Sequence, residues 1–185
     1  MALGVPDEPK SVAQALTRAR GLGIVALASA SNDGANNRIS FPASLDDVFC
    51  IGSANGKGGR SHFSPPFIGE EKYSALGEGV YGAVPMQVSK TESFGRKTGT
   101  STAVMVAAGI VALLMDYTRQ FIESGQGADN RANLRKLFLK MSEATAEEPY
   151  RFLSPHYLFT ISKDIKGLIK SVIRKPAGSP QYSYN

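Results

Sequence analysis

The sequence predicts an α/β fold in which helices pack against a parallel β-sheet. Two segments, residues 23–31 and 47–54, are apolar enough to form buried strands. Segments with a helical spacing of apolar residues precede and follow them, an order that favours a layered α/β structure. With 185 residues, of which 42% are hydrophobic, the chain is long enough for one globular domain with its own core.

The first predicted element is a helix over residues 11–23. Its apolar residues share one face, at the spacing of an amphipathic helix: Val12, Ala15, Leu16 and Ala19. Ser11 can act as its N-cap, and Gly21 or Gly23 can end it.

A turn signal, Asn-Asp-Gly at residues 32–34, follows the first predicted strand. Asn32 is therefore expected at the carboxyl end of a parallel strand, where α/β sheets bind ligands. Residues 55–67 have the composition of a surface loop, and a short strand is expected near Val80.

Residues 163–175 predict a basic amphipathic helix, in which five cations face one acid, Asp164. Such a helix can touch an anionic membrane, but packing of its apolar face on the domain is the simpler interpretation. The net charge of +5 is concentrated here, and we expect no nucleic-acid partner. We assign residues 1–160 to one domain, and residues 161–185 to this helix and a tail expected to be disordered.

Some protein classes are not indicated. The N-terminus has neither the basic nor the apolar segment of a signal peptide. No uninterrupted apolar run reaches the length of a membrane span. The single cysteine, Cys50, excludes an internal disulfide framework and is expected to be a buried thiol. The carboxylates lack the spacing of a calcium site, so we expect neither a metal nor another cofactor. The cellular compartment stays open.

Ser101 stands at the start of a long apolar segment. A Ser or Thr there is most often a helix cap, and Thr100 could equally fill that role. The position also suits chemistry, because free N–H groups and the positive end of a helix stabilise the oxyanion that forms when a serine attacks a carbonyl. Asn32 likewise has two interpretations, a turn residue or an amide donor to an oxyanion.

Together these segments resemble the subtilisin-like serine proteases, the subtilases. "GIVALASASNDG" resembles the family strand that ends in Ala-Gly-Asn-Glu/Asp-Gly, and "TGTSTAVMVAAGIVALL" resembles its nucleophile motif Gly-Thr-Ser-x-Ala-x-Pro. "MALG" resembles the Ser-Leu-Gly strand that binds substrate. Weaker similarities in "ISFPASLDDVFCIGSANGKGGRSHFSP" and "KYSALGEGVYGAVP" extend the resemblance over residues 1–120.

The resemblance implies a partial subtilisin-like three-layer fold, with a parallel sheet that lacks its N-terminal strands. It implies that Ser101 is the nucleophile of an acyl-enzyme, and that the Asn32 side chain and the Ser101 backbone N–H form the oxyanion hole. Ala2, Leu3 and Gly4 would pair with an extended polypeptide substrate as an added strand.

The family also requires an Asp and a His ahead of the Ser-Leu-Gly strand. The resemblance implies that both lie outside this chain. His62 and His156 stand in other contexts, so we expect neither to act as the base, and negligible peptidase activity from the chain alone. Within the matched segments, Ser31, Met105 and Ala2 replace the glycine, proline and serine of the family motifs.

Three functions remain open. The first is the C-terminal part of a subtilisin-like endopeptidase, which a reading frame encoding Asp-Thr/Ser-Gly and His-Gly-Thr ahead of Met1 would favour. The second is a non-catalytic pseudoprotease that binds peptides, which the absence of that frame would favour. The third is a structural or membrane-contact protein that uses residues 163–175. Liposome binding that survives deletion of those residues would exclude this mechanism.

Overall fold

The structure is a computed structural model that describes residues 1–34, 38–66, 72–83, 93–144, 151–160 and 162–175. Its helices and strands follow the chain in this order: α1 (Lys10–Gly21), β1 (Leu27–Ser29), β2 (Phe49–Ala54), β3 (Lys72–Leu76), β4 (Val80–Ala83), β5 (Phe94–Lys97), α2 (Thr100–Arg119), α3 (Arg131–Met141), β6 (Ser142–Ala144), β7 (Arg151–Leu153), α4 (His156–Phe159) and α5 (Ile165–Arg174).

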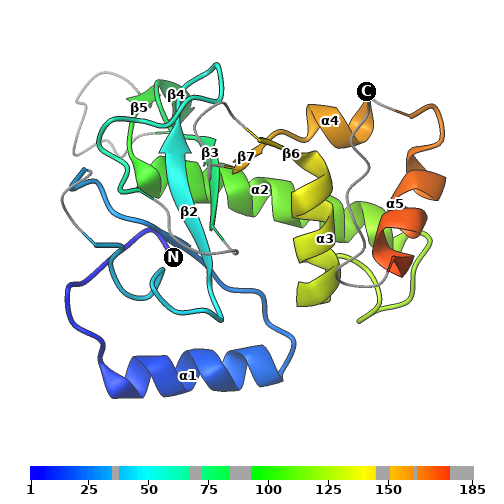
Figure 1. Ribbon diagram of the computed structural model, residues 1–185, viewed down its shortest axis with the longest axis horizontal. Helices are drawn as coiled ribbons and strands as arrows, with labels where there is room; N and C mark the ends of the chain where they lie inside the picture. The colour runs from blue at the N-terminus through cyan, green and yellow to red at the C-terminus, as the bar shows by residue number, and fades with distance from the viewer. Residues whose placement is uncertain (35–37, 67–71, 84–92, 145–150, 161, 176–185) are drawn as a thin grey trace.

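The main sheet has the strand order β1-β2-β3-β7-β6 (Figure 1). β1, β2 and β3 pair in parallel, with Leu27 opposite Phe49 and Cys50 opposite Lys72. β7 also runs parallel to β3, and β6 pairs antiparallel with β7. The predicted α/β class with a parallel sheet is therefore confirmed.

The strands differ in detail from the sequence prediction. The first is shorter than residues 23–31, because only Leu27–Ser29 pair with β2. β3 is a strand for which the sequence made no prediction, since five residues of mixed polarity carry little periodic signal. The strand expected near Val80 forms, but it pairs antiparallel with β5 outside the main sheet.

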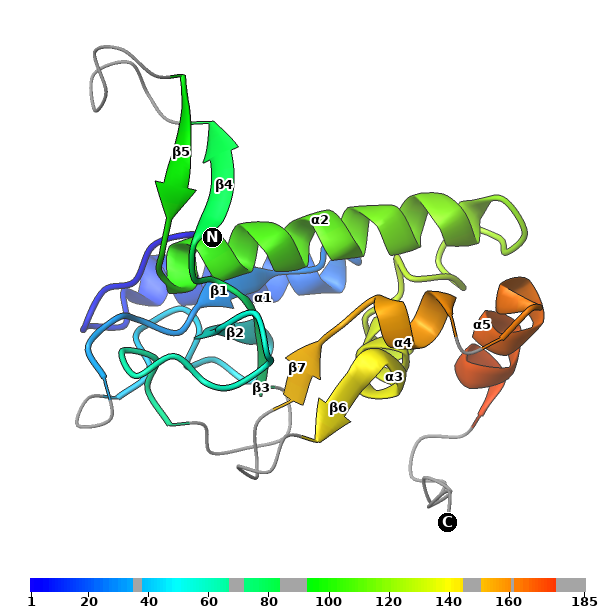
Figure 2. The ribbon, with the colours of Figure 1, turned by 90° about the horizontal axis from the view of Figure 1, so that it is seen from above.

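The core lies between the sheet and the helices on its faces. α2 crosses β1, β2 and β3, while α3 and α5 pack beside each other at the other end of α2 (Figure 2). β2 is buried at all six residues, as expected of a strand covered on both faces. The ring of Phe138 lies 5.2 Å from the ring of Phe49 and 5.0 Å from that of Tyr73, and the three anchor the core.

α2 has the length and composition that would let a helix cross a membrane. The sequence analysis did not indicate this, because it looked for an uninterrupted apolar run and found none of sufficient length. Core helices of soluble proteins meet the same criterion. The sheet side of α2 is buried, including Ala103, Ala107 and Leu114. The opposite side of α2 faces outward, where Met105 and Leu113 are 56% and 50% exposed.

The two end helices pack very differently. α1 begins at Lys10 after Pro9, so the prediction that Ser11 caps it is wrong, and it buries none of its residues. In α5 the Asp164 side chain accepts from the Gly167 N–H at 2.8 Å and caps the helix. Apolar residues of α5 pack against the main core: Ile165, Leu168, Ile169, Val172 and Ile173. The expected tail, residues 176–185, lies outside the described residues.

The segment expected to be a surface loop, residues 55–67, is partly buried over its described part, residues 55–66. Phe67 lies outside the described residues. Ser61 and Ser64 are buried, and both contact the buried end of β2. The Ser61 hydroxyl donates to Ser53 Oγ at 2.8 Å, and the Ser53 N–H donates to Ser64 Oγ at 3.2 Å. Hydroxyl groups that bond each other can be buried at small cost, which composition alone does not reveal.

One carboxylate closes the loop between α2 and α3. Asp129 accepts from the N–H groups of Gly125 and Gly127, at 2.7 and 3.1 Å, and from the Ser124 hydroxyl at 3.2 Å. Burial raises the pKa of Asp129, but these hydrogen bonds outweigh it and the pKa lies below the usual aspartate value. The loop therefore depends on the ionised form.

Acid should weaken the fold partly by protonating Asp129. Because its folded pKa is lowered, its stabilisation is present above the unfolded pKa and is lost as the pH falls through the folded pKa, below about pH 4. Asp129→Asn should therefore flatten the fall of the urea unfolding midpoint over this range. Glu123→Gln, which alters a carboxylate that pairs with the Gln126 side chain, is the control and should keep the original slope. Identical slopes for Asp129→Asn and the unmodified chain would contradict this.

Candidate active site

The carboxyl end of β1 meets the N-terminus of α2 through one side chain. Asn32 Oδ1 accepts a hydrogen bond from the Thr100 N–H at 2.8 Å and from the Thr100 hydroxyl at 3.0 Å. These bonds fix the amide with its oxygen toward α2. Within the described residues Asn32 Nδ2 donates to no group, so both of its hydrogens are available to a ligand.

The N-terminus of α2 is built on glycine. Gly99 is the N-cap residue, with φ of +149°, and neither Thr100 nor Ser101 caps the helix. The interpretation of Ser101 as a cap is therefore wrong. Ser101 is the second residue of α2, and within the described residues its backbone N–H has no hydrogen-bond partner. Such a free N–H at the positive end of a helix can bind an anion.

A second glycine holds this turn against the sheet. The Gly99 N–H donates to the Gly77 carbonyl at 2.8 Å, just past the end of β3. A Cβ on Gly77 would overlap with Ser53 Oγ and would lie 2.9 Å from both the Ala103 Cβ and the Gly99 carbonyl. Only glycine permits this close approach, which sets the height of Ser101 above the sheet.

The N-terminal segment runs beside β1 and reaches the same point. The Ser29 N–H donates to the Met1 carbonyl at 3.1 Å, and Val5 and Phe41 exchange hydrogen bonds of 2.9 and 3.0 Å. The Ser101 hydroxyl donates to the Ala2 carbonyl at 3.4 Å, a long hydrogen bond. The structure thus brings the segment of residues 2–4, predicted from "MALG", next to Ser101.

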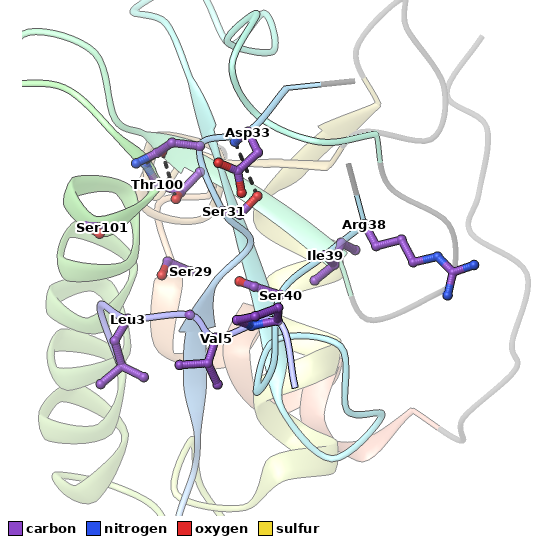
Figure 3. Close-up of a pocket in the computed structure, with 13 residues that line it drawn as sticks. Leu3, Val5, Ser29, Ser31, Asp33, Arg38, Ile39, Ser40, Thr100 and Ser101 are labelled. Carbon is purple, nitrogen blue, oxygen red and sulfur yellow. Dashed lines mark hydrogen bonds between the residues drawn. The ribbon is translucent and has the colours of Figure 1, made fainter. Parts of the chain in front are cut away.

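A pocket of about 670 Å³ opens where these segments converge (Figure 3). Its lining includes four residues that the sequence singled out: Leu3, Gly4, Asn32 and Ser101. The ionisable side chains among the lining residues are Asp33 and Arg38. Ala2 contributes through its carbonyl contact with Ser101, although it does not line the pocket. The volume is that of a ligand site for a side chain or small molecule.

Sequence reasoning missed part of this pocket. Ile39 and Ser40 line it because the chain returns past β1, where the Ser40 N–H donates to the Ala30 carbonyl at 3.0 Å. Nothing in the local sequence signals that return. Thr100 was weighed only as a helix cap, whereas its N–H and hydroxyl hold Asn32. Thr100 directly precedes Ser101, and this position was the signal in the sequence that could have indicated its role at the site.

Neither histidine of the chain lies at the site. His62 is exposed on the loop after β2 and its ring meets Phe63, and His156 begins α4 and its ring meets Tyr157. Neither lines the pocket or hydrogen-bonds Ser101. The described residues hold no cluster of three or more His, Cys, Asp or Glu side chains arranged to bind a metal ion.

Comparison with known proteins identifies the family of this chain. A sequence model described as the subtilase family matches residues 1–148. The chain belongs to the subtilase family. Subtilisin DY of Bacillus licheniformis is 33% identical over 119 residues, which cover 62% of this chain and 41% of that protein. Minor extracellular protease Epr of Bacillus subtilis (strain 168) is 26% identical over 153 residues, 82% of this chain and 22% of Epr.

Solved structures agree with the fold. The PatG macrocyclase domain is 29% identical, with a TM-score of 0.65 over 77% of this chain and 42% of that one. A mutant of the protease domain of PatA has a TM-score of 0.68 at 21% identity, over 91% of this chain and 56% of that one. The chain therefore has the fold of a subtilisin-like protease domain, and it spans less than 60% of the length of each of these relatives.

The residue before Asn32 departs from the family motif in a way that the backbone explains. Ser31 has φ of +134°, a conformation that favours glycine, and the subtilase motif has glycine at this position. The Ser31 hydroxyl accepts from the Asp33 N–H at 3.4 Å, which is a weak compensation. Ser31 therefore stores strain of roughly 1–3 kcal/mol beside the pocket.

Ser31→Gly should stabilise the chain. Glycine relieves the backbone strain but also raises the conformational entropy of the unfolded chain, which lowers stability by a smaller amount. The net effect should be an increase of about 1 kcal/mol in the free energy of unfolding, measured with urea. The matched control is Ser11→Gly in α1, which should lower the same free energy by up to about 0.5 kcal/mol, because the helix propensity of glycine is lower than that of serine. Destabilisation by Ser31→Gly similar to that of the control would show that Ser31 is not strained.

Proposed function

We propose that this chain carries the nucleophile part of a subtilisin-like serine endopeptidase. In this reaction Ser101 Oγ bonds to the carbonyl carbon of a peptide bond, the C–N bond breaks, and an acyl-enzyme forms. The serine proton passes through a base to the leaving amine. Membership of the subtilase family and the convergence of Ser101, Asn32 and the pocket support this function.

Two donors are available for the oxyanion. Asn32 Oδ1 is held by Thr100, which leaves Nδ2 free, and the Ser101 backbone N–H is free at the first turn of α2. We assign the oxyanion hole to these two groups. Donors fixed in place before the reaction stabilise the developing charge without reorganisation, and in subtilisin itself loss of the asparagine side-chain donor costs about 10²–10³ in turnover.

The substrate is inferred to be an extended polypeptide. Ala2, Leu3 and Gly4 lie beside Ser101 and can pair with a peptide backbone as an added strand. The pocket would take one side chain next to the cleaved bond, with Leu3, Val5 and Ile39 as apolar walls. Among the structural relatives, PatG macrocyclase has been solved in complex with peptide, which fits this substrate class.

The proton transfer requires a base within hydrogen-bond reach of the Ser101 hydroxyl, and within the described residues neither Asp33 nor another ionisable side chain bonds that hydroxyl. The Ser101 hydroxyl donates to the Ala2 carbonyl, which cannot accept the proton in catalysis. Neither histidine lies at the pocket. We therefore propose that the catalytic base comes from outside these 185 residues.

The alternative function is a peptide-binding pseudoprotease. One observation favours it. The pocket and the neighbouring segment of residues 2–4 are in place, but the Ser101 hydroxyl contacts the Ala2 carbonyl and not a base. Peptide binding needs only the pocket and a strand edge, whereas cleavage also needs the base.

Fluorophosphonate labelling separates an activated serine from an inactive one. The chain alone should label at Ser101 far more slowly than subtilisin DY, because loss of the base removes most of the reactivity of the hydroxyl. Ser101→Ala should abolish the residual labelling, and Ser44→Ala, which changes an exposed serine, should leave it unchanged. Labelling of the chain at a rate similar to that of subtilisin DY would contradict the claim that the base is external.

A further inference from the structure

A row of cations runs along one side of α5, beside its buried face. Lys166, Lys170 and Arg174 stand at every fourth position, and we call these three residues the cationic row. Lys166 and Arg174 are exposed, and Lys170 is half-buried. Residues 163–175 hold five cations and one acid, so they account for most of the net charge of +5 and the rest of the chain is nearly neutral.

Two of these cations are held over one aromatic ring. Lys166 Nζ and Lys170 Nζ lie 5.2 and 5.7 Å from the centroid of the Phe121 ring, in the segment that follows α2. The face of an aromatic ring attracts ammonium groups, but the ring carries no net charge. Phe121 therefore positions the two charges next to each other without neutralising them.

Within the described residues no carboxylate pairs with the cationic row. The Asp164 side chain is occupied by the Gly167 N–H as the cap of α5, and Glu123 accepts from the Gln126 side chain at 3.0 Å. At the C-terminal end of α5, Lys136 of α3 donates to a backbone carbonyl at 2.6 Å and brings a further cation. This surface is therefore positive along the whole of α5.

We propose that the cationic row binds an extended acidic polypeptide whose carboxylates occupy alternate positions. Successive cations of the row rise about 6 Å along α5. Alternate side chains of an extended chain point to the same face and lie about 6.6 Å apart, so three carboxylates can meet the three cations in one register. Like charges one turn apart destabilise a helix, and such a partner relieves that repulsion.

The packing of α5 favours this partner over a membrane or a nucleic acid. A membrane-bound helix buries its apolar face in lipid, whereas the apolar face of α5 packs on the core, with Ile169 fully buried. Single-stranded nucleic acids stack their bases on aromatic side chains, whereas Phe121 is half-buried and lies under Lys166 and Lys170. Duplex DNA carries one charge per about 1.7 Å, far more densely than the row.

The cationic row lies far from Ser101. Ser101 is in the first turn of α2 and Phe121 follows its last turn (Figure 2), so the length of α2, about 30 Å, separates them. In a polypeptide substrate the acidic segment would therefore lie at least about nine extended residues from the cleaved bond. This position on a substrate rests on the proposed function, whereas the binding surface rests on the cationic row.

Fluorescence anisotropy with a labelled peptide tests this surface. The probe is an alternating glutamate–serine peptide of about ten residues, and the corresponding glutamine–serine peptide is its neutral control. Lys166→Gln combined with Lys170→Gln removes two charges from the row. Lys10→Gln combined with Lys57→Gln removes two charges from exposed lysines elsewhere and is the matched control. Lys166→Arg combined with Lys170→Arg keeps both charges.

The unmodified chain should bind the acidic peptide and not the neutral one, and salt at about 0.15 M should weaken the binding. Loss of two exposed ion pairs should weaken it about five-fold in the glutamine variant of the row. The arginine variant and the Lys10–Lys57 variant should bind as the unmodified chain does. Equal weakening in both glutamine variants, weakening of the same size in the arginine variant, or no binding of the acidic peptide overturns the proposal.

Phosphatidylcholine–phosphatidylserine vesicles and an oligothymidylate of equal charge are measured with the same variants. Tighter binding of either one, lost in the glutamine variant of the row, overturns the proposal in favour of a membrane or a nucleic acid. Ser101→Ala should bind the acidic peptide like the unmodified chain, because this binding does not involve the nucleophile. Failure of the proposed peptidase would therefore leave peptide binding intact, whereas loss of peptide binding overturns the cationic row alone.

Discussion

The pair of hydrogen bonds from Thr100 to Asn32 Oδ1 joins two segments that lie 68 residues apart in the chain. It ties the carboxyl end of the sheet to the first turn of the core helix α2. Because the amide oxygen is held, the amide nitrogen and the Ser101 N–H remain free as donors on the pocket side. The proposed oxyanion hole, the pocket and the orientation of α2 all depend on this contact.

The backbone around this contact is set by residues without side chains. Gly77 and Gly99 allow β3 and α2 to approach until their main chains bond at 2.8 Å. Ser31 occupies a conformation that suits glycine, so strain accumulates on the β1 side of the same junction. Strain tolerated next to a pocket is typical of functional sites, where geometry is preserved at the expense of stability.

Periodicity in the sequence predicted the parallel sheet, and the resemblance of two motifs to a known family predicted the long helix and a shared site for Asn32 and Ser101, which both line the pocket. They did not predict that Gly99 would replace Ser101 as the N-cap, since capping depends on the angle at which the chain enters the helix. They also missed Ser40, which reaches the pocket through a tertiary return of the chain. The exposure of Met105 and Leu113 could not be read from periodicity, because an apolar residue on a helix gives the same pattern whether it is buried or exposed.

Hydrogen exchange of single backbone amides tests the central contact most directly. The Thr100 N–H lies in the first turn of α2, where no intrahelical acceptor exists, so its protection depends on Asn32. We predict that the Thr100 amide exchanges slowly, that Asn32→Ala makes it exchange freely, and that the Ile110 amide in mid-helix stays protected in both. A Thr100 amide that exchanges freely in the unmodified chain, or remains protected in Asn32→Ala, would contradict the account.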